Sequence, residues 1–288
     1  MENEKSTLSP IGKIFDWLGK AFLKTTPGKL FALFVKTILS FFSANRNFRT
    51  DFRNVVLQTF FTGVEIFPIL FVVASLFGPV VIVETMSIMS KVGFANVVGN
   101  VLVVTVVREL GPIFTAFLIA GRSGSALATM IGNMQINSEI DALSSMGISP
   151  IRYLVMPSLL GGVIAVFIMS ICFCVSSLGM GYLISKIFVM VAGQTMNVQL
   201  TWNYLYTSLV DALTFTDFVM IVLKPLVFGI IIVINACYQG LRVERDFRNL
   251  PKATSRSVIF SFLYIVIADA MLSVFFIFQY LGEISKII

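Results

Sequence analysis

Residues 137–153, NSEIDALSSMGISPIRY, form a short polar stretch between two long apolar runs. Residues 138–141 fit the Ser-x-x-Asp pattern of a capping box, which begins a helix. Three apolar residues follow at helical spacing: Ile140, Leu143 and Met146. Gly147 is a suitable C-terminal cap, and Pro150 prevents the helix from continuing. The stretch therefore predicts a short helix of about two turns over residues 138–147.

A helix of this length is only marginally stable alone in water, so its apolar stripe must pack on something. Two interpretations are open. In the first, it is a loop helix that rests on its own bundle. In the second, it is a coupling helix that docks into a groove on a cytoplasmic ATPase and transmits motion to the membrane spans. The residues predicted to make that contact are Glu139, Ile140, Asp141, Leu143, Met146 and Gly147.

The composition places the chain in a membrane. Of its 288 residues, 57% are hydrophobic and 12% are charged, whereas soluble domains average about 45–50% apolar and about 25% charged residues. Five apolar runs are long enough to cross a bilayer as helices. We predict spans at about 55–83, 97–120, 153–184, 218–238 and 257–280. The predicted fold class is an all-α polytopic membrane protein.

The chain shows no signature of an enzyme. It has no His, the commonest general base and metal ligand. Its three cysteines lie in apolar runs without the spacing of a metal site, and no Gly-Lys pair completes a P-loop. We therefore expect a non-catalytic subunit with no cofactor or metal of its own, and any ATP hydrolysis must come from another chain.

The chain divides into two predicted regions, 1–54 and 55–288. The first mixes lysines with Phe, Leu, Ile and Trp, which is typical of amphipathic helices that lie in the headgroup plane; a disordered tail with a short extra span is the alternative. With the N-terminus in the cytoplasm, nearly all Lys and Arg of the loops fall on that side, and only Lys91, Lys186 and Lys286 fall on the other. This bias predicts a cytoplasmic N-terminus, and five crossings then put the C-terminus on the opposite side.

Four charged residues fall inside the predicted spans: Arg108, Glu109, Lys224 and Asp269. A charge at mid-bilayer costs about 2.5–3.5 kcal/mol, so it usually faces protein or water. Arg108 and Glu109 are adjacent and cannot share a helix face, so each needs its own partner. Asp269 is the expected partner of Arg108 or Lys224, although Lys224 has the alternative of extending to the interface. The four form either an ion-pair network that locks the bundle, or a polar site beneath a lipid headgroup that rearranges during transport.

Two further groups of residues are assigned from their size and position. The small residues between Gly121 and Ala128 predict close helix packing within the subunit rather than at a dimer interface. The first span contains Pro68 and Pro79, and its bend places several large apolar residues where a lipid cavity is expected. The predicted cavity residues are Phe67, Leu70, Phe71 and Phe77.

Residues 109–157 resemble the signature of the MlaE/YrbE permease family, the membrane subunits of Mce-associated lipid ABC transporters. The matching segments are Arg108 to Pro112, Ala120 to Arg122, Gly124 to Ala126, Ile140 to Leu143, Met146-Gly147 and Pro150. Two segments depart from the family pattern. Residues 74–79 replace its late first-span segment, and residues 243–248 replace the Gly-rich loop that usually precedes the last span.

The resemblance implies a permease subunit, in the bacterial inner membrane, that moves phospholipid or a related lipid to or from a periplasmic Mce-domain partner. It also implies a homodimer served by a cytoplasmic ABC ATPase that binds ATP and Mg²⁺, with a small regulatory subunit as a further candidate partner. The C-terminus would be periplasmic. The residues alone leave two other functions open: an ion-coupled transporter or channel that uses Arg108, Glu109, Lys224 and Asp269, or a structural scaffold.

Overall fold

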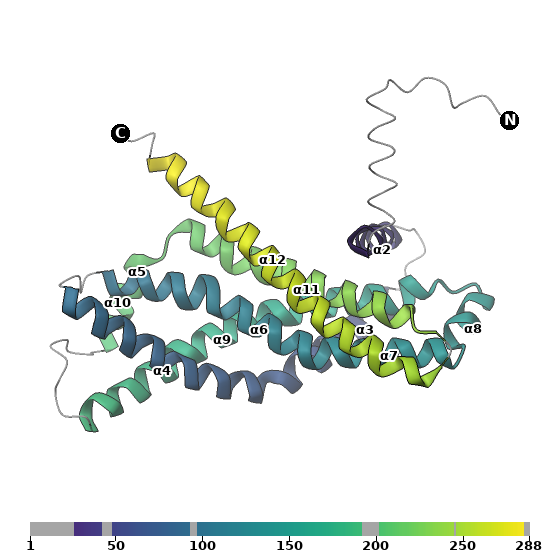
Figure 1. Ribbon diagram of the computed structural model, residues 1–288, viewed down its shortest axis with the longest axis horizontal. Coiled ribbons are helices and arrows are strands. Elements are labelled where there is room, and N and C mark those ends of the chain that lie inside the picture. The colour runs from purple at the N-terminus through teal and green to yellow at the C-terminus, as the bar shows by residue number, and fades with distance from the viewer. Residues whose placement is uncertain (1–25, 42–47, 93–96, 192–201, 245, 285–288) are drawn as a thin grey trace, which may run out of the picture.

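The computed structural model describes residues 26–41, 48–92, 97–191, 202–244 and 246–284 (Figure 1). Within these ranges the chain folds into helices and contains no strand. Five of the helices are long and apolar enough to cross a membrane: Phe52–Met89, Val98–Ile136, Ile151–Ile187, Phe215–Leu241 and Phe247–Phe276. The chain is therefore an all-α polytopic membrane protein, as its sequence predicts.

Several of the spans are built from consecutive helical segments. The first contains α3 (Phe48–Gly63), η1 (Val64–Ile66) and α4 (Phe67–Val92), and the second contains α5 (Val98–Leu102), η3 (Val103–Leu110), α6 (Gly111–Ile119), η4 (Ala120–Gly124) and α7 (Ser125–Ile136). The third joins η5 (Ile151–Val155) to α9 (Met156–Val191), the fourth is α11 (Phe215–Leu241), and the fifth joins η6 (Phe247–Asn249) to α12 (Leu250–Ile284). One break in each of the first two spans lies beside a proline, Pro68 or Pro112, since proline fits the first turn of a helix better than its interior.

The α9 helix lies at the centre of the bundle and contacts α3, α4, α6 and α11. The main core cluster joins Phe173 of α9 to Leu70 of α4 and to Phe228 of α11. Two of the small residues, Gly124 of η4 and Ala128 of α7, face α11 in the same subunit: a Cβ added to Gly124 would lie 3.2 Å from Ile232, and one added to Gly240 would lie 2.9 Å from the carbonyl oxygen of Ala128. These two residues pack within the subunit, as predicted, whereas Ala126 is exposed.

The α2 helix (Thr26–Phe41) lies crosswise to the spans. Figure 1 shows it nearly end-on, while the spans run along the long axis of the molecule. Its Leu30, Leu33 and Phe34 pack against the bundle, and its Lys29 and Lys36 are exposed. This arrangement suits a helix in the headgroup plane. The earlier part of the predicted amphipathic segment, residues 1–25, lies outside the described residues.

The short helix predicted from residues 138–147 is α8 (Glu139–Ser145), and it lies at one end of the bundle (Figure 1). The predicted capping box is wrong at Ser138: its backbone is left-handed, with φ of 59°, and its side chain makes no capping hydrogen bond. The predicted C-terminal cap is confirmed. Gly147 has φ of 76°, and the amides of Gly147 and Ile148 donate to the carbonyls of Ser144 and Leu143, both at 3.0 Å. These two bonds form a Schellman motif, which ends the helix.

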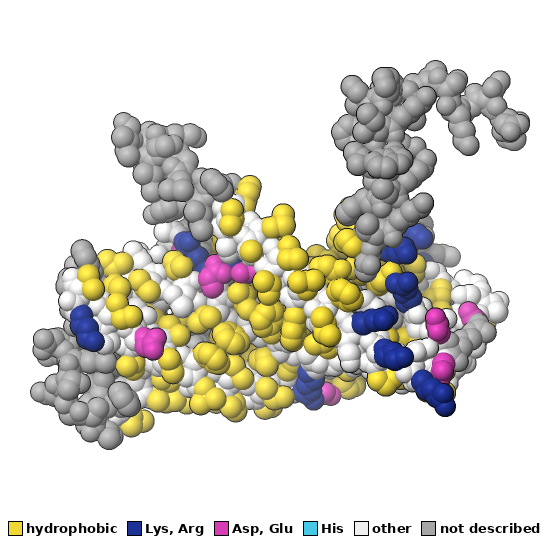
Figure 2. Space-filling view, viewed as in Figure 1, with side chains coloured by type: hydrophobic (Ala, Val, Ile, Leu, Met, Phe, Trp, Pro, Cys, Tyr) yellow, Lys and Arg dark blue, Asp and Glu magenta, His cyan; other side chains and the backbone are white. Residues whose placement is uncertain are grey.

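Basic residues gather at the end of the bundle that carries α8. Figure 2 shows most of the Lys and Arg side chains of the visible face in that half of the molecule. Toward the opposite end, where α5 and α10 (Trp202–Ala212) lie, the described basic residues are Lys91, Lys186 and Arg108. The charge asymmetry expected from the sequence is thus an asymmetry between the two ends of the folded bundle.

Candidate functional site

Three spans meet at the buried ammonium group of Lys224. Its Nζ lies 2.7 Å from Glu109 Oε2 of η3 and 2.7 Å from Asp269 Oδ1 of α12. It also donates to Ser273 Oγ of α12 at 2.9 Å, and that hydroxyl donates to Glu109 Oε1 at 3.1 Å. Lys224 is fully buried, so it does not extend to the interface. The structure thus brings Glu109, Lys224 and Asp269 together in one ion cluster.

Arg108 joins a different ion pair. Its Nε donates to Oδ1 of Asp217, a buried residue in the first turn of α11. The other carboxylate oxygen of Asp217 accepts hydrogen bonds from the backbone amide and the hydroxyl of Thr214, at 2.8 and 2.6 Å. Thr214 and Asp217 therefore form a true capping box. The sequence reasoning missed Asp217, although the Thr-x-x-Asp pattern at 214–217 was the signal that marks it.

The backbone of the second span separates Arg108 from Glu109. Both lie in η3, a π-helical segment, and adjacent helical residues point about 100° apart. Arg108 therefore reaches the start of α11, while Glu109 reaches the middle of α11 and α12. The other two π-helical segments, η4 and η5, also carry an arginine each, Arg122 and Arg152. π-Helical turns are rare in proteins as a whole, and those that occur are often found at functional sites.

The cluster around Lys224 does not balance its charges. One ammonium group faces two carboxylates, and the Glu109 side chain is still 33% exposed. A buried ion pair contributes little net stability, because removing its charges from water costs about as much as the pairing returns. The cluster holds three spans in register, and its excess carboxylate makes it able to accept a proton or a cationic group. It is the candidate functional site.

The residues predicted to line a lipid cavity do not share one environment. Phe67 and Phe71 are adjacent on the exposed surface of α4, with ring centroids 6.2 Å apart. Phe77 is partly exposed and packs against Phe114, at 4.6 Å between centroids. Leu70, in contrast, is fully buried in the main core. The structure therefore leaves the three phenylalanines able to contact lipid and assigns Leu70 to packing.

The residues predicted to contact an ATPase fall into a buried group and an exposed group on α8. Ile140 is buried and Leu143 is partly buried; both belong to a core cluster that also contains residues of α7, α9 and α11, and α8 itself contacts α7. Met146 is 66% exposed, the neighbouring Ile148 is 40% exposed, and Glu139, Asp141 and Gly147 are exposed as well. The apolar stripe therefore both anchors α8 to its own bundle and leaves an apolar tip at Met146.

Comparison with known proteins places the chain among transporters. The family described as "Permease MlaE" matches residues 55–275. A probable ABC transporter permease protein of Synechocystis is 30% identical over 87% of this chain and 94% of its own length. A probable ABC transporter permease protein of Rickettsia typhi is 27% identical over 76% of this chain and 81% of its own length.

A plant protein is also similar. The chloroplastic protein trigalactosyldiacylglycerol 1 of Arabidopsis thaliana is 29% identical over 83% of this chain. The match covers 65% of that relative, so this chain spans slightly less than two thirds of it. The family match includes the Lys224 ion cluster, the Arg108–Asp217 ion pair and all of α8. The chain belongs to the MlaE permease family.

Proposed function

We propose that this chain is the permease subunit of an ABC transporter that moves phospholipid or a related lipid between the bacterial inner membrane and a periplasmic Mce-domain partner. The observation that carries the proposal is the family match over residues 55–275, which contains both the buried ion cluster and α8. The Arabidopsis relative is named after trigalactosyldiacylglycerol, a glycolipid with two acyl chains. This name favours a substrate that also has two acyl chains. The chain itself contributes no catalysis; ATP and Mg²⁺ bind to the partner ATPase.

The exposed tip of α8 is proposed as the contact with that ATPase. Ile140 and Leu143 fix α8 to the bundle, so a force on Met146 would be transmitted to α7. Since each ATPase of a pair needs its own coupling helix, the subunit is proposed to act as a homodimer. The face of α12 that carries Leu263, Ile267 and Met271 is exposed, and we propose that it packs on the second copy.

The Lys224 cluster is proposed as the polar centre of the lipid path. Phe67, Phe71 and Phe77 provide apolar surface on α4 for acyl chains. An ion-coupled transporter remains the alternative that the cluster itself would favour. Such a protein would need no ATPase, so co-purification distinguishes the two functions.

The experiment is purification of the tagged chain in a mild detergent, followed by native mass spectrometry. Two copies of the chain with two ATPase chains, an Mce-domain protein and bound phospholipid are expected, and a small regulatory subunit would be detected in the same spectrum. A chain that purifies alone, under conditions that preserve other membrane complexes, would contradict the proposal.

The variant Met146→Lys tests the contact with the ATPase. A lysine is favourable at the C-terminal end of α8 because of the helix dipole, so the fold is retained. We expect loss of the ATPase from the purified complex with normal membrane insertion. The matched control is Val97→Lys, which adds the same charge to an exposed apolar position at the opposite end. Equal amounts of ATPase with both variants would exclude α8 as the docking element.

A further inference from the structure

A polar cleft lies between the end of α11 and the beginning of α12. Its volume is about 290 Å³, and its polar lining comes from Gln239, Arg242, Glu244, Asn249, Lys252 and Arg256. Gln239 is buried, while the three basic side chains are exposed at the rim. Val243 and Glu244, which also line the cleft, belong to the segment 243–248, in which the sequence departs from the family pattern.

The cleft has a surplus of positive charge. It contains three cations and one carboxylate, and that carboxylate, Glu244, already accepts a hydrogen bond from Asn249 Nδ2 at 3.2 Å. Arg242 has one long contact, from Nη1 to the Tyr238 hydroxyl at 3.4 Å. Among the residues that the structure describes, neither Arg242 nor Lys252 nor Arg256 forms an ion pair. Three cationic groups therefore share one cleft with a single carboxylate, which leaves a surplus of two positive charges.

The position of two of these cations opposes the helix dipole. Lys252 and Arg256 lie in the first two turns of α12, one turn apart on the same side. The N-terminal end of a helix carries partial positive charge and favours anions. Two cations there are unfavourable in an empty cleft, and a bound anion would remove the repulsion.

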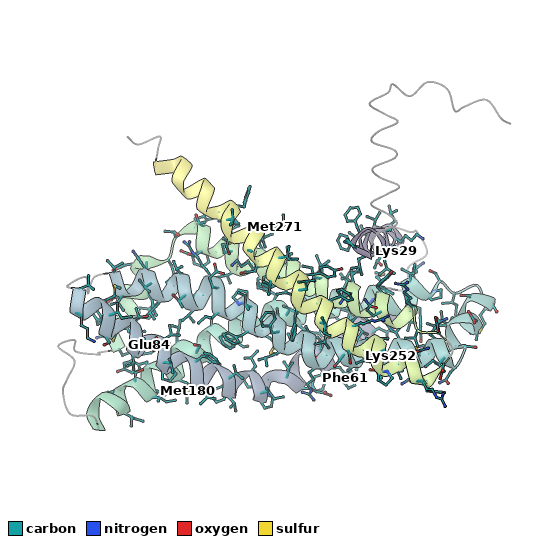
Figure 3. The ribbon with its side chains drawn as sticks, viewed as in Figure 1. Lys29, Phe61, Glu84, Met180, Lys252 and Met271 are labelled. Atoms are coloured by element: carbon teal, nitrogen blue, oxygen red, sulfur yellow. The ribbon has the colours of Figure 1, made fainter. Side chains whose placement is uncertain are left out.

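The cleft lies at the depth of lipid headgroups. Asp269 is about 20 Å further along α12 than Arg256, at 1.5 Å per residue, so a mid-bilayer Asp269 puts Arg256 near the headgroup layer. Figure 3 shows Lys252 on the first turns of α12, toward the end of the bundle that carries α8. The cleft is thus on the proposed cytoplasmic face and well separated from the Lys224 cluster.

We infer that this cleft binds a phosphate-bearing anion. Phosphate oxygens accept the bidentate hydrogen bonds of arginine, and basic pockets between spans bind anionic lipid headgroups. The volume of about 290 Å³ is sufficient for a headgroup, and the polar lining does not suit acyl chains, which would remain in the bilayer. Two sources supply this chemistry on the cytoplasmic face: the headgroup of an anionic phospholipid and free phosphate. The site is additional to the transport path and gives the divergent segment 243–248 a function.

The test is a binding titration of the purified full chain in detergent, read out by native mass spectrometry. The probes are dioctanoyl phosphatidylglycerol, dioctanoyl phosphatidylcholine and inorganic phosphate. The variant is Lys252→Gln/Arg256→Gln. The control is Lys29→Gln/Lys36→Gln, which removes the same charge from exposed positions on α2. All four side chains are exposed, so neither variant should lower the melting temperature of the chain.

Phosphatidylglycerol is expected to bind about tenfold more weakly to the cleft variant, since two charge-assisted hydrogen-bonding groups are lost, with little change in the control. The same selective loss for inorganic phosphate, without a preference for the lipid, would also support the site and identify free phosphate as its source. Equal weakening in both variants, or none in the cleft variant, would overturn the inference. Should the cleft variant fail to fold, Arg242→Gln on the opposite wall gives the same test.

Discussion

At the scale of the residue, Lys224 links three spans through a single ammonium group. Its partners come from η3 and α12, and it has no exposed surface. Removal of the ammonium would leave Glu109 and Asp269 facing each other without a cation between them. Loss of one member of a buried ion pair is far more harmful than the pair is beneficial, because the remaining charge stays in a poor solvent.

We therefore expect Lys224→Met to destabilise the chain by about 3–5 kcal/mol. The triple variant Lys224→Met/Glu109→Gln/Asp269→Asn should recover part of that loss, because it leaves no uncompensated charge. The measurement is the unfolding midpoint in detergent. Glu65→Gln is the comparison: Glu65 Oε2 lies 3.1 Å from Arg122 Nη2, but both side chains are nearly half exposed, so the change should be about 0–1 kcal/mol. Similar losses in Lys224→Met and Glu65→Gln would contradict the importance given to burial.

Single residues also show where the sequence was insufficient. The sequence predicts that Arg108 and Glu109 need separate partners, and the structure gives each its own. The sequence does not single out Asp217, because it directly precedes the apolar run 218–238 and therefore has the position of an ordinary loop residue. Leu70 was misassigned because a uniformly apolar helix gives no sign of which face meets protein and which meets lipid.

At the scale of the element, the sequence predicts where a helix ends better than it predicts which face of the helix meets protein or lipid. Gly147 was recognised because only a left-handed residue suits the end of a Schellman motif. The start of α8 was not, since a Ser-x-x-Asp pattern does not reveal that the tight turn after α7 forces Ser138 to a positive φ. The helices are longer than the predicted spans because they continue into polar residues past the apolar runs, as the second does to Ile136.

The α4–α9 pair gives a prediction about helix contact. A Cβ added to Gly78 of α4 would lie 2.0 Å from the carbonyl oxygen of Ser177, so the two backbones touch there. Gly78→Ala must push the helices apart, and we expect a loss of about 1–3 kcal/mol. The matched control is Gly179→Ala on α9, where a Cβ would meet nothing within 4 Å and where alanine should be neutral or stabilising by up to about 1 kcal/mol. The unfolding midpoints of the two variants decide this, and equal midpoints would show that the contact is not tight.

At the scale of the whole molecule, the two ends of the bundle differ in charge and in proposed role. The end with α8 also holds the basic cleft and the exposed lysines of α2, and the opposite end holds α5 and α10 (Figures 1 and 2). Docking of a cytoplasmic ATPase requires that the α8 end faces the cytoplasm. Binding of anionic lipid and the gathering of basic residues at this end require the same orientation. The three features therefore share one requirement, which is the orientation of the chain.

Cysteine labelling tests this orientation. Met146→Cys places a thiol on the exposed tip of α8, and Asn203→Cys places one on the exposed surface of α10. Spheroplasts treated with a membrane-impermeant maleimide should be labelled at Asn203→Cys, whereas Met146→Cys should react only after the membrane is permeabilised. The unmodified chain is the background control, because Cys174 and Cys237 are buried and Cys172 is partly buried. Labelling of Met146→Cys in intact spheroplasts would place α8 outside the cytoplasm, and neither ATPase docking at Met146 nor a cytoplasmic headgroup site at Lys252 and Arg256 would then be possible.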